Sequence, residues 1–478
     1  MNINSLKKTL IPLSLTIVLL SVSYQTYSQQ SNTLYFMRGV PQIYQINPAF
    51  QPECNFFIGF PGIAPLQMRV ENSSFALNDV LIYNDELDSL ITFLHPLADK
   101  GYFLSLLKDR NHLNTELSTS IGSMGFRVKN SYLSFDIATR GNVRFTYPAD
   151  LLKFPINGPD SDMNYDFNGL AINSTVWNEF AIGYSLKISQ NLSVGWRGKL
   201  LIGAFNMQMK KFDVLLSTGE DEWDLKSDIL LNTSVPFLDV VYDEEGMIDF
   251  DSTELREFPE SLLPVLLNPK NMGLAMDIGI DYRPTEWLQV SASLTDFGSI
   301  NWRDRVHNLE NNTEYNFKGF EINPGDDDDV LQIMADSFEQ EFKYSATQNS
   351  YRTWLPSKFY AGASFYPHPK INFGILSRTE FLQGDIRQQF TLSANFYPLR
   401  MLSAAFSYSV LEGYYKNLGF GLSLKPGPFN FYIVTDTGPS AALWPYETRF
   451  INLRMGLNLT FGCIKEKKKP KFDMPSCP

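Results

Sequence analysis

Histidines and recognised catalytic motifs are scarce in this chain, which argues against an enzymatic function. Only four histidines occur among 478 residues, and they lack the paired spacing of a zinc site: His95, His112, His307 and His368. The sequence also lacks the Gly-x-Ser-x-Gly motif of serine hydrolases. We therefore expect no catalytic residues, no metal site and no cofactor, and we predict that the protein is not an enzyme.

Long apolar runs are lacking as well. Beyond the N-terminus, no stretch of about 18 apolar residues could form a membrane helix. At the N-terminus, Lys7 and Lys8 precede the short apolar run Leu10–Ser23, and the small residues Thr26 and Ser28 follow. This pattern predicts that residues 1–28 are a secretory signal peptide, the alternative being a buried or anchoring helix.

Positive charge is in deficit. The chain has 40 Lys and Arg against 52 Asp and Glu, a net charge of −12. Removing residues 1–28 deletes Lys7 and Lys8 and leaves 38 basic against 52 acidic residues, or −14. The one basic run, Lys465–Lys471, lies in the tail. This balance argues against a nucleic-acid partner.

What the sequence does contain is strict alternation of apolar and polar residues in consecutive segments. In Ile386–Pro398 one face carries Phe390 and Leu392, and the other carries Arg387, Gln389 and further polar residues. Leu402–Val410, Lys416–Lys425 and Phe450–Phe461 repeat the pattern. Side chains on a strand alternate between faces, so each segment predicts a strand with one apolar and one polar face. Such strands fit either a soluble sandwich or a barrel in lipid.

The connections favour the barrel. Short turns such as Arg283–Glu286 alternate with long connections such as 207–270 and 301–354, as in outer-membrane barrels with short periplasmic turns and long external loops. We predict an all-β, transmembrane antiparallel β-barrel of about fourteen strands in the outer membrane of a Gram-negative bacterium, with both termini periplasmic. The predicted strands are 57–76, 116–128, 131–142, 171–188, 192–206, 271–284, 287–300, 355–367, 370–382, 386–398, 401–411, 415–425, 429–438 and 447–462.

Several external connections carry patterns of their own. Helical spacing in Asn78–Leu107, Glu254–Leu267 and Val330–Phe342 predicts helical segments in these loops. Phe212–Leu216 and Trp223–Leu231 predict a hairpin outside the membrane. The run Asp326–Asp329 has carboxylates that suit calcium, but it lacks the alternating spacing and the downstream Glu of a calcium loop. Four acids ahead of a helix match the positive end of its dipole, and we favour this structural interpretation.

The segment before the first strand carries a resemblance. Met37–Phe50 includes the triplet Asn47-Pro48-Ala49, which resembles the hatch segment of long-chain fatty-acid transporter (FadL-like) barrels. More closely, the whole chain resembles an uncharacterised Bacteroidota-type outer-membrane barrel family of this superfamily. Gly273–Trp302 is similar to the PorV-like branch of the FadL-like superfamily. The Gly/Ala-rich stretch that fatty-acid transporters place before the triplet is absent here.

The expected lumen is lined by charges of both signs. A barrel of fourteen strands is too wide for side chains alone to fill, so water or a plug must occupy it. We therefore predict that residues 29–55 form an N-terminal plug, that residues 56–463 form the barrel and that 464–478 form a periplasmic tail. The alternative is a solvated lumen whose charges pair with one another. Candidate plug and lumen residues are Asn47, Pro48, Ala49, Asp277, Asp281, Arg378, Glu380, Arg387 and Arg454.

Three cysteines remain near the ends of the predicted barrel. Because the first and last strands of a closed barrel are neighbours, Cys54 and Cys463 could meet and form a disulfide across the seam. A Cys463–Cys477 bridge and three free thiols are the alternatives.

Two functions fit these observations. The first is a plugged FadL-like channel for transport of a small or hydrophobic ligand. The second, implied by the PorV-like resemblance, is a non-conducting component of a secretion or assembly complex. Expected partners are outer-membrane lipid, a hydrophobic small molecule and other outer-membrane or secretion-complex proteins.

Overall fold

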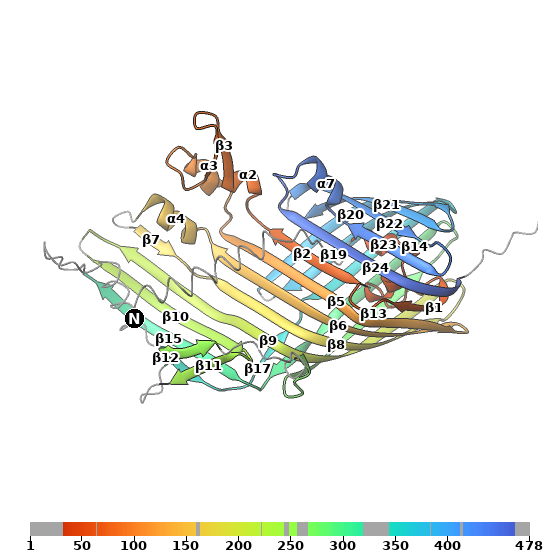
Figure 1. The fold of residues 1–478 in the computed structure, drawn as a ribbon, viewed down its shortest axis with the longest axis horizontal. Helices are drawn as coiled ribbons and strands as arrows, with labels where there is room; N and C mark the ends of the chain where they lie inside the picture. The colour runs from red at the N-terminus through yellow and green to blue at the C-terminus, as the bar shows by residue number, and fades with distance from the viewer. Residues whose placement is uncertain are drawn as a thin grey trace, which may run out of the picture.

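The computed structural model describes residues 32–63, 65–158, 163–220, 222–242, 248–255, 266–318, 344–382, 384–411 and 414–463. Its main feature is a closed antiparallel β-barrel (Figure 1). Two pairs of elements, β1 with β2 and β17 with β18, are successive parts of one wall strand, so the ring has fourteen strands. This confirms the predicted fold class. The wall elements are β1 (Cys54–Gly59), β2 (Leu66–Asn72), β5 (Arg110–Val128), β6 (Ser131–Pro148), β8 (Ala171–Lys187), β9 (Leu192–Thr218), β13 (Met272–Tyr282), β14 (Leu288–Trp302), β17 (Tyr351–Trp354), β18 (Ser357–His368), β19 (Ile371–Leu382), β20 (Asp385–Leu399), β21 (Leu402–Leu411), β22 (Tyr414–Leu424), β23 (Phe429–Thr435) and β24 (Phe450–Cys463).

The two faces of the wall are inverted relative to a soluble protein. On β20 the apolar side chains point outward, with Phe390 58% and Leu392 57% exposed. The polar side chains of the same strand point inward and are buried, with Arg387 and Gln389 each 2% exposed. A soluble sandwich would bury the apolar face, so this arrangement excludes it and indicates an outer surface that faces lipid. Among the described residues, no helix is long and apolar enough to span a membrane.

The barrel closes where its first strand meets its last. β1 and β2 each pair with β24 on one side and with β5 on the other. The short turns lie at the end of the barrel where β1 begins and β24 ends, and the long connections lie at the opposite end (Figure 1). We call these the short-turn end and the long-loop end.

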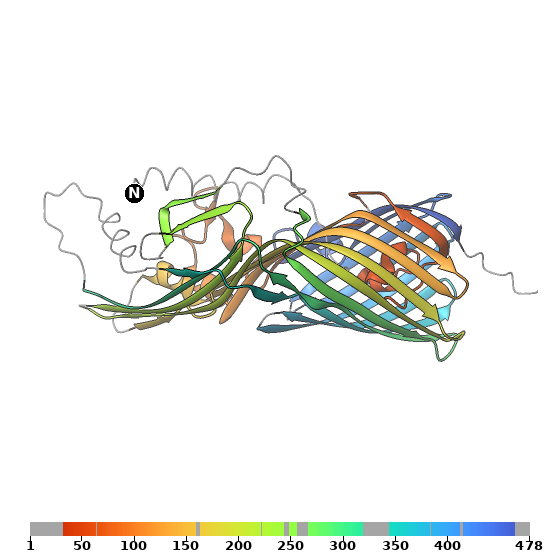
Figure 2. The ribbon, with the colours of Figure 1, turned by 90° about the horizontal axis from the view of Figure 1, so that it is seen from below.

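At the long-loop end, several strands continue beyond the ring. β9 runs for 27 residues and forms a hairpin with β10, and β10 also pairs with β15. The resulting sheet projects away from the barrel (Figure 2). The predicted hairpin of Phe212–Leu216 and Trp223–Leu231 lies in this projection. Elements outside the ring are β3 (Leu81–Asn84), β4 (Ser89–Thr92), β7 (Met163–Asp166), β10 (Trp223–Ser234), β11 (Leu238–Tyr242), β12 (Ile248–Leu255), β15 (Val306–Phe317) and β16 (Ser345–Thr347), with helices α2 (Leu77–Val80), α3 (Lys100–Ser105), α4 (Asp150–Asn157) and α7 (Gly438–Leu443).

The helical prediction for Asn78–Leu107 is wrong in its middle part. Only the short helices α2 and α3 form, and between them β3 and β4 pair as a hairpin. Asp88, at φ 48°, supplies the left-handed turn residue that closes this hairpin. Of the predicted helix Glu254–Leu267, the first two residues belong to β12 and 256–265 lie outside the described residues. Val330–Phe342 and Asp326–Asp329 also lie outside them.

Candidate functional site

The candidate site is the lumen, and its short-turn half contains the N-terminal segment 32–51. Two short 3₁₀ turns, η1 (Thr33–Phe36) and η2 (Pro41–Gln45), shape this segment, and every residue of both turns is buried. The turns lie within the ring of strands (Figure 2). Pro41 stands at the first position of η2, where its missing amide hydrogen costs no helical hydrogen bond.

The triplet predicted to lie in the plug forms a tight turn against two wall strands. The Oδ1 atom of Asn47 accepts a hydrogen bond from the amide of Ala49 at 2.9 Å. The Nδ2 atom of Asn47 donates to the carbonyls of Ile280 on β13 at 3.2 Å and Ala292 on β14 at 3.3 Å. Pro48 lies against β9, where a Cβ added to Gly195 would be 2.2 Å from the Pro48 carbonyl oxygen. The triplet therefore contacts three wall strands.

A buried carboxylate holds the start of the segment. Asp436, 1% exposed, accepts hydrogen bonds from the amide of Asn32 at 2.8 Å and from the amide and hydroxyl of Thr33 at 2.9 and 2.5 Å. Thr33 also shares a hydrogen bond with Ser407 at 2.6 Å. The segment is thus fastened both at residues 32–33 and at the Asn47 turn.

Glycines in the wall make room for the side chains of the segment. A Cβ added to Gly362 would lie 2.6 Å from the ring of Tyr35, and one added to Gly374 would lie 2.2 Å from the ring of Phe36. Contacts of this kind also link Gly419 with Thr33, Gly421 with Met37 and Gly279 with Asn47. A larger residue at these positions would require these side chains to move, so the wall is shaped to hold the segment as it lies.

Above the segment, charged side chains form an ion layer that crosses the lumen. Arg69 on β2, 0% exposed, pairs with Glu71 at 2.6 Å, Glu116 at 3.2 Å and Glu380 at 3.2 Å. β2 and β19, which carries Glu380, lie nearly opposite each other in the ring. Arg378 pairs with the same Glu380 at 3.3 Å. Long side chains therefore bridge a lumen that shorter ones would leave open.

A second group of charges continues this layer on the other side of the lumen. Asp277 on β13 pairs with Arg197 at 2.7 Å and Lys199 at 2.6 Å. It also accepts the amide of Asp296 at 2.7 Å, where Asp296, at φ 59°, forms a bulge in β14. Asp296 in turn pairs with Arg140 of β6 at 3.3 Å. Asp277 thus both neutralises two cations and supports the bulge.

The segment and the ion layer share a contact at Asp136. One carboxylate oxygen of Asp136 pairs with Arg197 at 2.8 Å. The other accepts hydrogen bonds from the hydroxyl of Tyr44 at 2.7 Å and from the side-chain Nε2 of Gln45 at 2.9 Å. Removing the segment would therefore leave Asp136 with only part of its partners.

The remaining residues predicted from the sequence lie near the N-terminal segment or in the ion layer. Arg454 donates to the side-chain oxygen of Gln45, and Asp281 accepts from Gln289 near the short-turn end. Arg387 pairs with Glu71 at 2.9 Å. Sequence analysis missed Arg69, Glu71, Glu116 and Asp436. The alternation of β2 could have indicated Arg69 and Glu71, because both share the inward face with Gln67.

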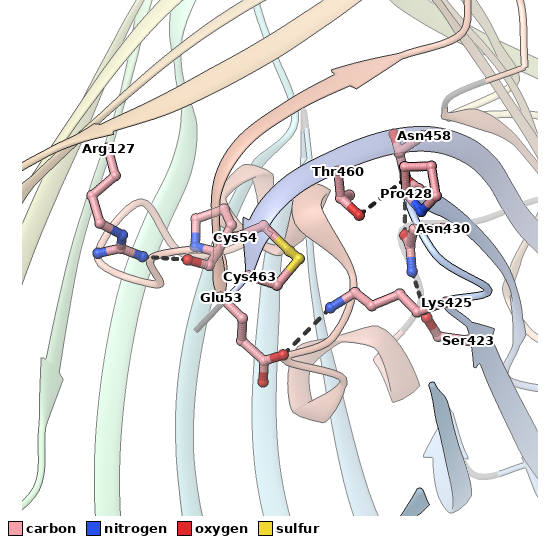
Figure 3. Close-up of a disulfide and its surroundings, with 11 residues drawn as sticks. Glu53, Cys54, Arg127, Ser423, Lys425, Pro428, Asn430, Asn458, Thr460 and Cys463 are labelled. Carbon is pink, nitrogen blue, oxygen red and sulfur yellow. Dashed lines mark hydrogen bonds and ion pairs between the residues drawn. A yellow bond between two sulfur atoms is a disulfide. The ribbon is translucent and has the colours of Figure 1, made fainter. Parts of the chain in front are cut away.

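The seam carries a disulfide between Cys54 and Cys463 (Figure 3). Next to it, Lys425 pairs with Glu53 at 3.4 Å and Arg127 donates to Gln51 at 2.6 Å. These contacts fix the point where the N-terminal segment leaves the lumen and becomes β1. Cys477 lies outside the described residues.

We expect a nonreducing peptide map to contain a Cys54–Cys463 cross-linked peptide. Cys477→Ser is the matched control and should retain this peptide, whereas Cys463→Ser should lose it because it removes one of the two sulfurs. A map of the wild-type protein in which Cys463 is joined to Cys477 would contradict the seam disulfide.

The long-loop end contains two connected cavities. A cavity of about 310 Å³ is lined partly by apolar residues, among them Trp177, Met207, Leu355 and Phe381. It shares Arg144 and other lining residues with a wider vestibule of about 930 Å³. Among the described residues, no group of three or more His, Cys, Asp or Glu side chains could hold a metal ion.

A family model described as "Family of unknown function (DUF5723)" matches residues 48–436. No curated protein matches the chain. Among solved structures, the chain is similar to the toluene transporter TbuX of Ralstonia pickettii, with 8% identity, 88% of this chain and 94% of that chain covered, and a TM-score of 0.41. It is also similar to a FadL homologue of Pseudomonas aeruginosa, with 9% identity and a TM-score of 0.38, where the match covers 92% of this chain and 100% of that chain. Similarity at this level says nothing of the ligand of this chain.

Proposed function

The chain belongs to the family of unknown function DUF5723, and from this premise we propose that it is an outer-membrane channel that is closed at rest and admits a small hydrophobic ligand. The observation that carries the proposal is a barrel with an apolar outer face, a filled lumen and a cavity lined partly by apolar residues at its long-loop end. In this proposal, residues 32–51 are the plug.

The orientation follows from the same reasoning. The short-turn end holds the start of the first wall strand and the end of the last. We assign this end to the periplasm, because outer-membrane barrels have their short turns there. The seam disulfide supports this assignment, since the periplasm permits disulfides. The long-loop end then faces the outside and receives the ligand.

The 310 Å³ cavity suits an apolar ligand and reaches the wall of the barrel. Trp354 and Phe381, 55% and 44% exposed, line it together with inward-facing Trp177. Between β17 and β18 the wall passes through Leu355 and Pro356, and a proline has no amide hydrogen to donate to a neighbouring strand. These features support entry through a side opening at this point as well as from the vestibule.

Filling the cavity tests the ligand. Thr175 lines it, and Thr175→Trp is expected to abolish co-purification of an apolar small molecule, detected by mass spectrometry after extraction in mild detergent. Thr379→Trp is the matched control, because Thr379 lies on the outward face of β19 with Phe373 and Phe381. Wild-type protein with no apolar ligand, or Thr175→Trp protein that retains it, would contradict the proposal.

A second function is favoured by the projecting sheet. β9, β10 and β15 extend beyond the ring, and a channel needs no such projection for conduction. This supports a non-conducting, PorV-like component of a secretion or assembly complex that binds other proteins through the sheet. Mass spectrometry of the proteins that co-purify with the tagged native protein distinguishes the two. Stoichiometric protein partners without an apolar ligand would favour the complex.

A further inference from the structure

The vestibule at the long-loop end differs in charge from the rest of the protein. Seven Lys and Arg side chains line this cavity of about 930 Å³, against two carboxylates, Asp213 and Asp385. The chain as a whole carries a net charge of −12. A concentration of positive charge in a cavity of an acidic protein attracts anions to that cavity.

One of these cations is positioned with a free donor. Arg144, 9% exposed, donates from Nε to Thr146 at 3.3 Å and pairs through Nη2 with Asp385 at 2.8 Å. Its buried Nη1 atom has no hydrogen-bond partner. A buried guanidinium donor without an acceptor is costly, so a ligand oxygen at this position would be stabilised.

Other cations of the vestibule are only partly neutralised. Among the described residues, Lys108 and Lys210 form no ion pair, whereas Lys211 pairs with Asp213 and Asp228. Several cations around one fixed guanidinium suit a group with two or more negative oxygens better than a single carboxylate.

We propose that the vestibule binds a phosphate or sulfate ester group, with Arg144 as its central donor. The group could belong to the headgroup of an outer-leaflet lipid or to a free solute, since both present the same oxygens. This site goes beyond the proposed function, because it requires neither the passage of a solute nor an apolar ligand. Arg144 lines both cavities, whereas Thr175 lines only the smaller one. The Thr175→Trp experiment therefore tests the hydrophobic ligand separately.

Calorimetric titration of the purified full-length protein with inorganic pyrophosphate at low salt tests the site. Arg144→Gln is expected to weaken binding about tenfold or more, the loss of one charge-assisted hydrogen bond. Lys210→Gln changes an exposed residue, and it should weaken binding less than Arg144→Gln and reduce the dependence of binding on salt. Lys226→Gln is the matched control, since Lys226 lies outside the vestibule and should leave binding unchanged.

The same preparations distinguish the source of the group. A phosphate-bearing lipid that remains on wild-type protein in native mass spectrometry, and is lost from Arg144→Gln, indicates a lipid headgroup. Binding of pyrophosphate without any retained lipid indicates a free solute. Absence of pyrophosphate binding together with absence of retained phosphate-bearing lipid, or equal binding by wild type, Arg144→Gln and Lys210→Gln, would overturn the proposal.

Discussion

Arg69→Met is expected to lower the free energy of unfolding by about 3–5 kcal/mol, the usual cost of removing one partner from a buried ion pair. Arg69 is fully buried and contacts the carboxylates of Glu71, Glu116 and Glu380. Methionine fills a similar volume but has no charge. Glu71, Glu116 and Glu380 would therefore each lose one positively charged partner while their carboxylates stay shielded from water.

Urea unfolding of the barrel in detergent, followed by the gel mobility of the folded form, measures this effect. Lys226→Met is the matched control: Lys226 and its partner Glu314 have side chains 60% and 73% exposed, and exposed pairs contribute at most about 1 kcal/mol. Adding Glu380→Gln to Arg69→Met neutralises one of the three acids that have lost a cation, and it should restore part of the stability. Equal small losses for Arg69→Met and Lys226→Met would show that the ion layer does not stabilise the barrel.

The wall of the barrel could be predicted from the sequence because strand alternation is a local signal. Ile386, Phe390 and Leu392 are separated by even numbers of residues, and this spacing alone assigns them to one face of a strand. The short turns then place consecutive strands side by side. Fourteen strands and an apolar outer face follow from these local patterns.

The partners across the lumen could not be predicted in the same way. Arg69 and Glu380 are 311 residues apart, and alternation shows only that both point inward. Which inward charge meets which depends on the shape of the closed ring. Asp436 is a similar case: as a single acid after a strand it carries no pattern, yet it holds Thr33 across 403 residues.

Inward-facing glycines in the sequence indicate the close contacts between the wall and the N-terminal segment, but only the structure shows what they contact. Gly419 and Gly421 alternate on the polar face of β22, where a solvated lumen would tolerate any polar side chain. Glycine at inward positions of a strand often marks close approach of another part of the chain. In the structure these two glycines contact Thr33 and Met37.

Displacing the N-terminal segment is the second change with a large expected effect. Gly279→Val would place a Cβ 2.0 Å from Oδ1 of Asn47 and 3.0 Å from the ring of Pro48, so the turn at the triplet could not stay in its place. We expect residues 32–50 to leave the lumen and to become sensitive to added protease. Gly122→Val is the matched control, because nothing lies within 4 Å of the corresponding Cβ.

Single-channel recording then tests whether the segment is a plug. Deleting residues 32–50 should produce small, brief openings, because the ion layer above the segment still crosses the lumen. Combining the deletion with Arg69→Met should produce larger and longer openings, since the main bridge between β2 and β19 is then lost as well. Large openings in Arg69→Met alone, with the segment still protected from protease, would mean that the ion layer is the only barrier and that the segment is not a plug.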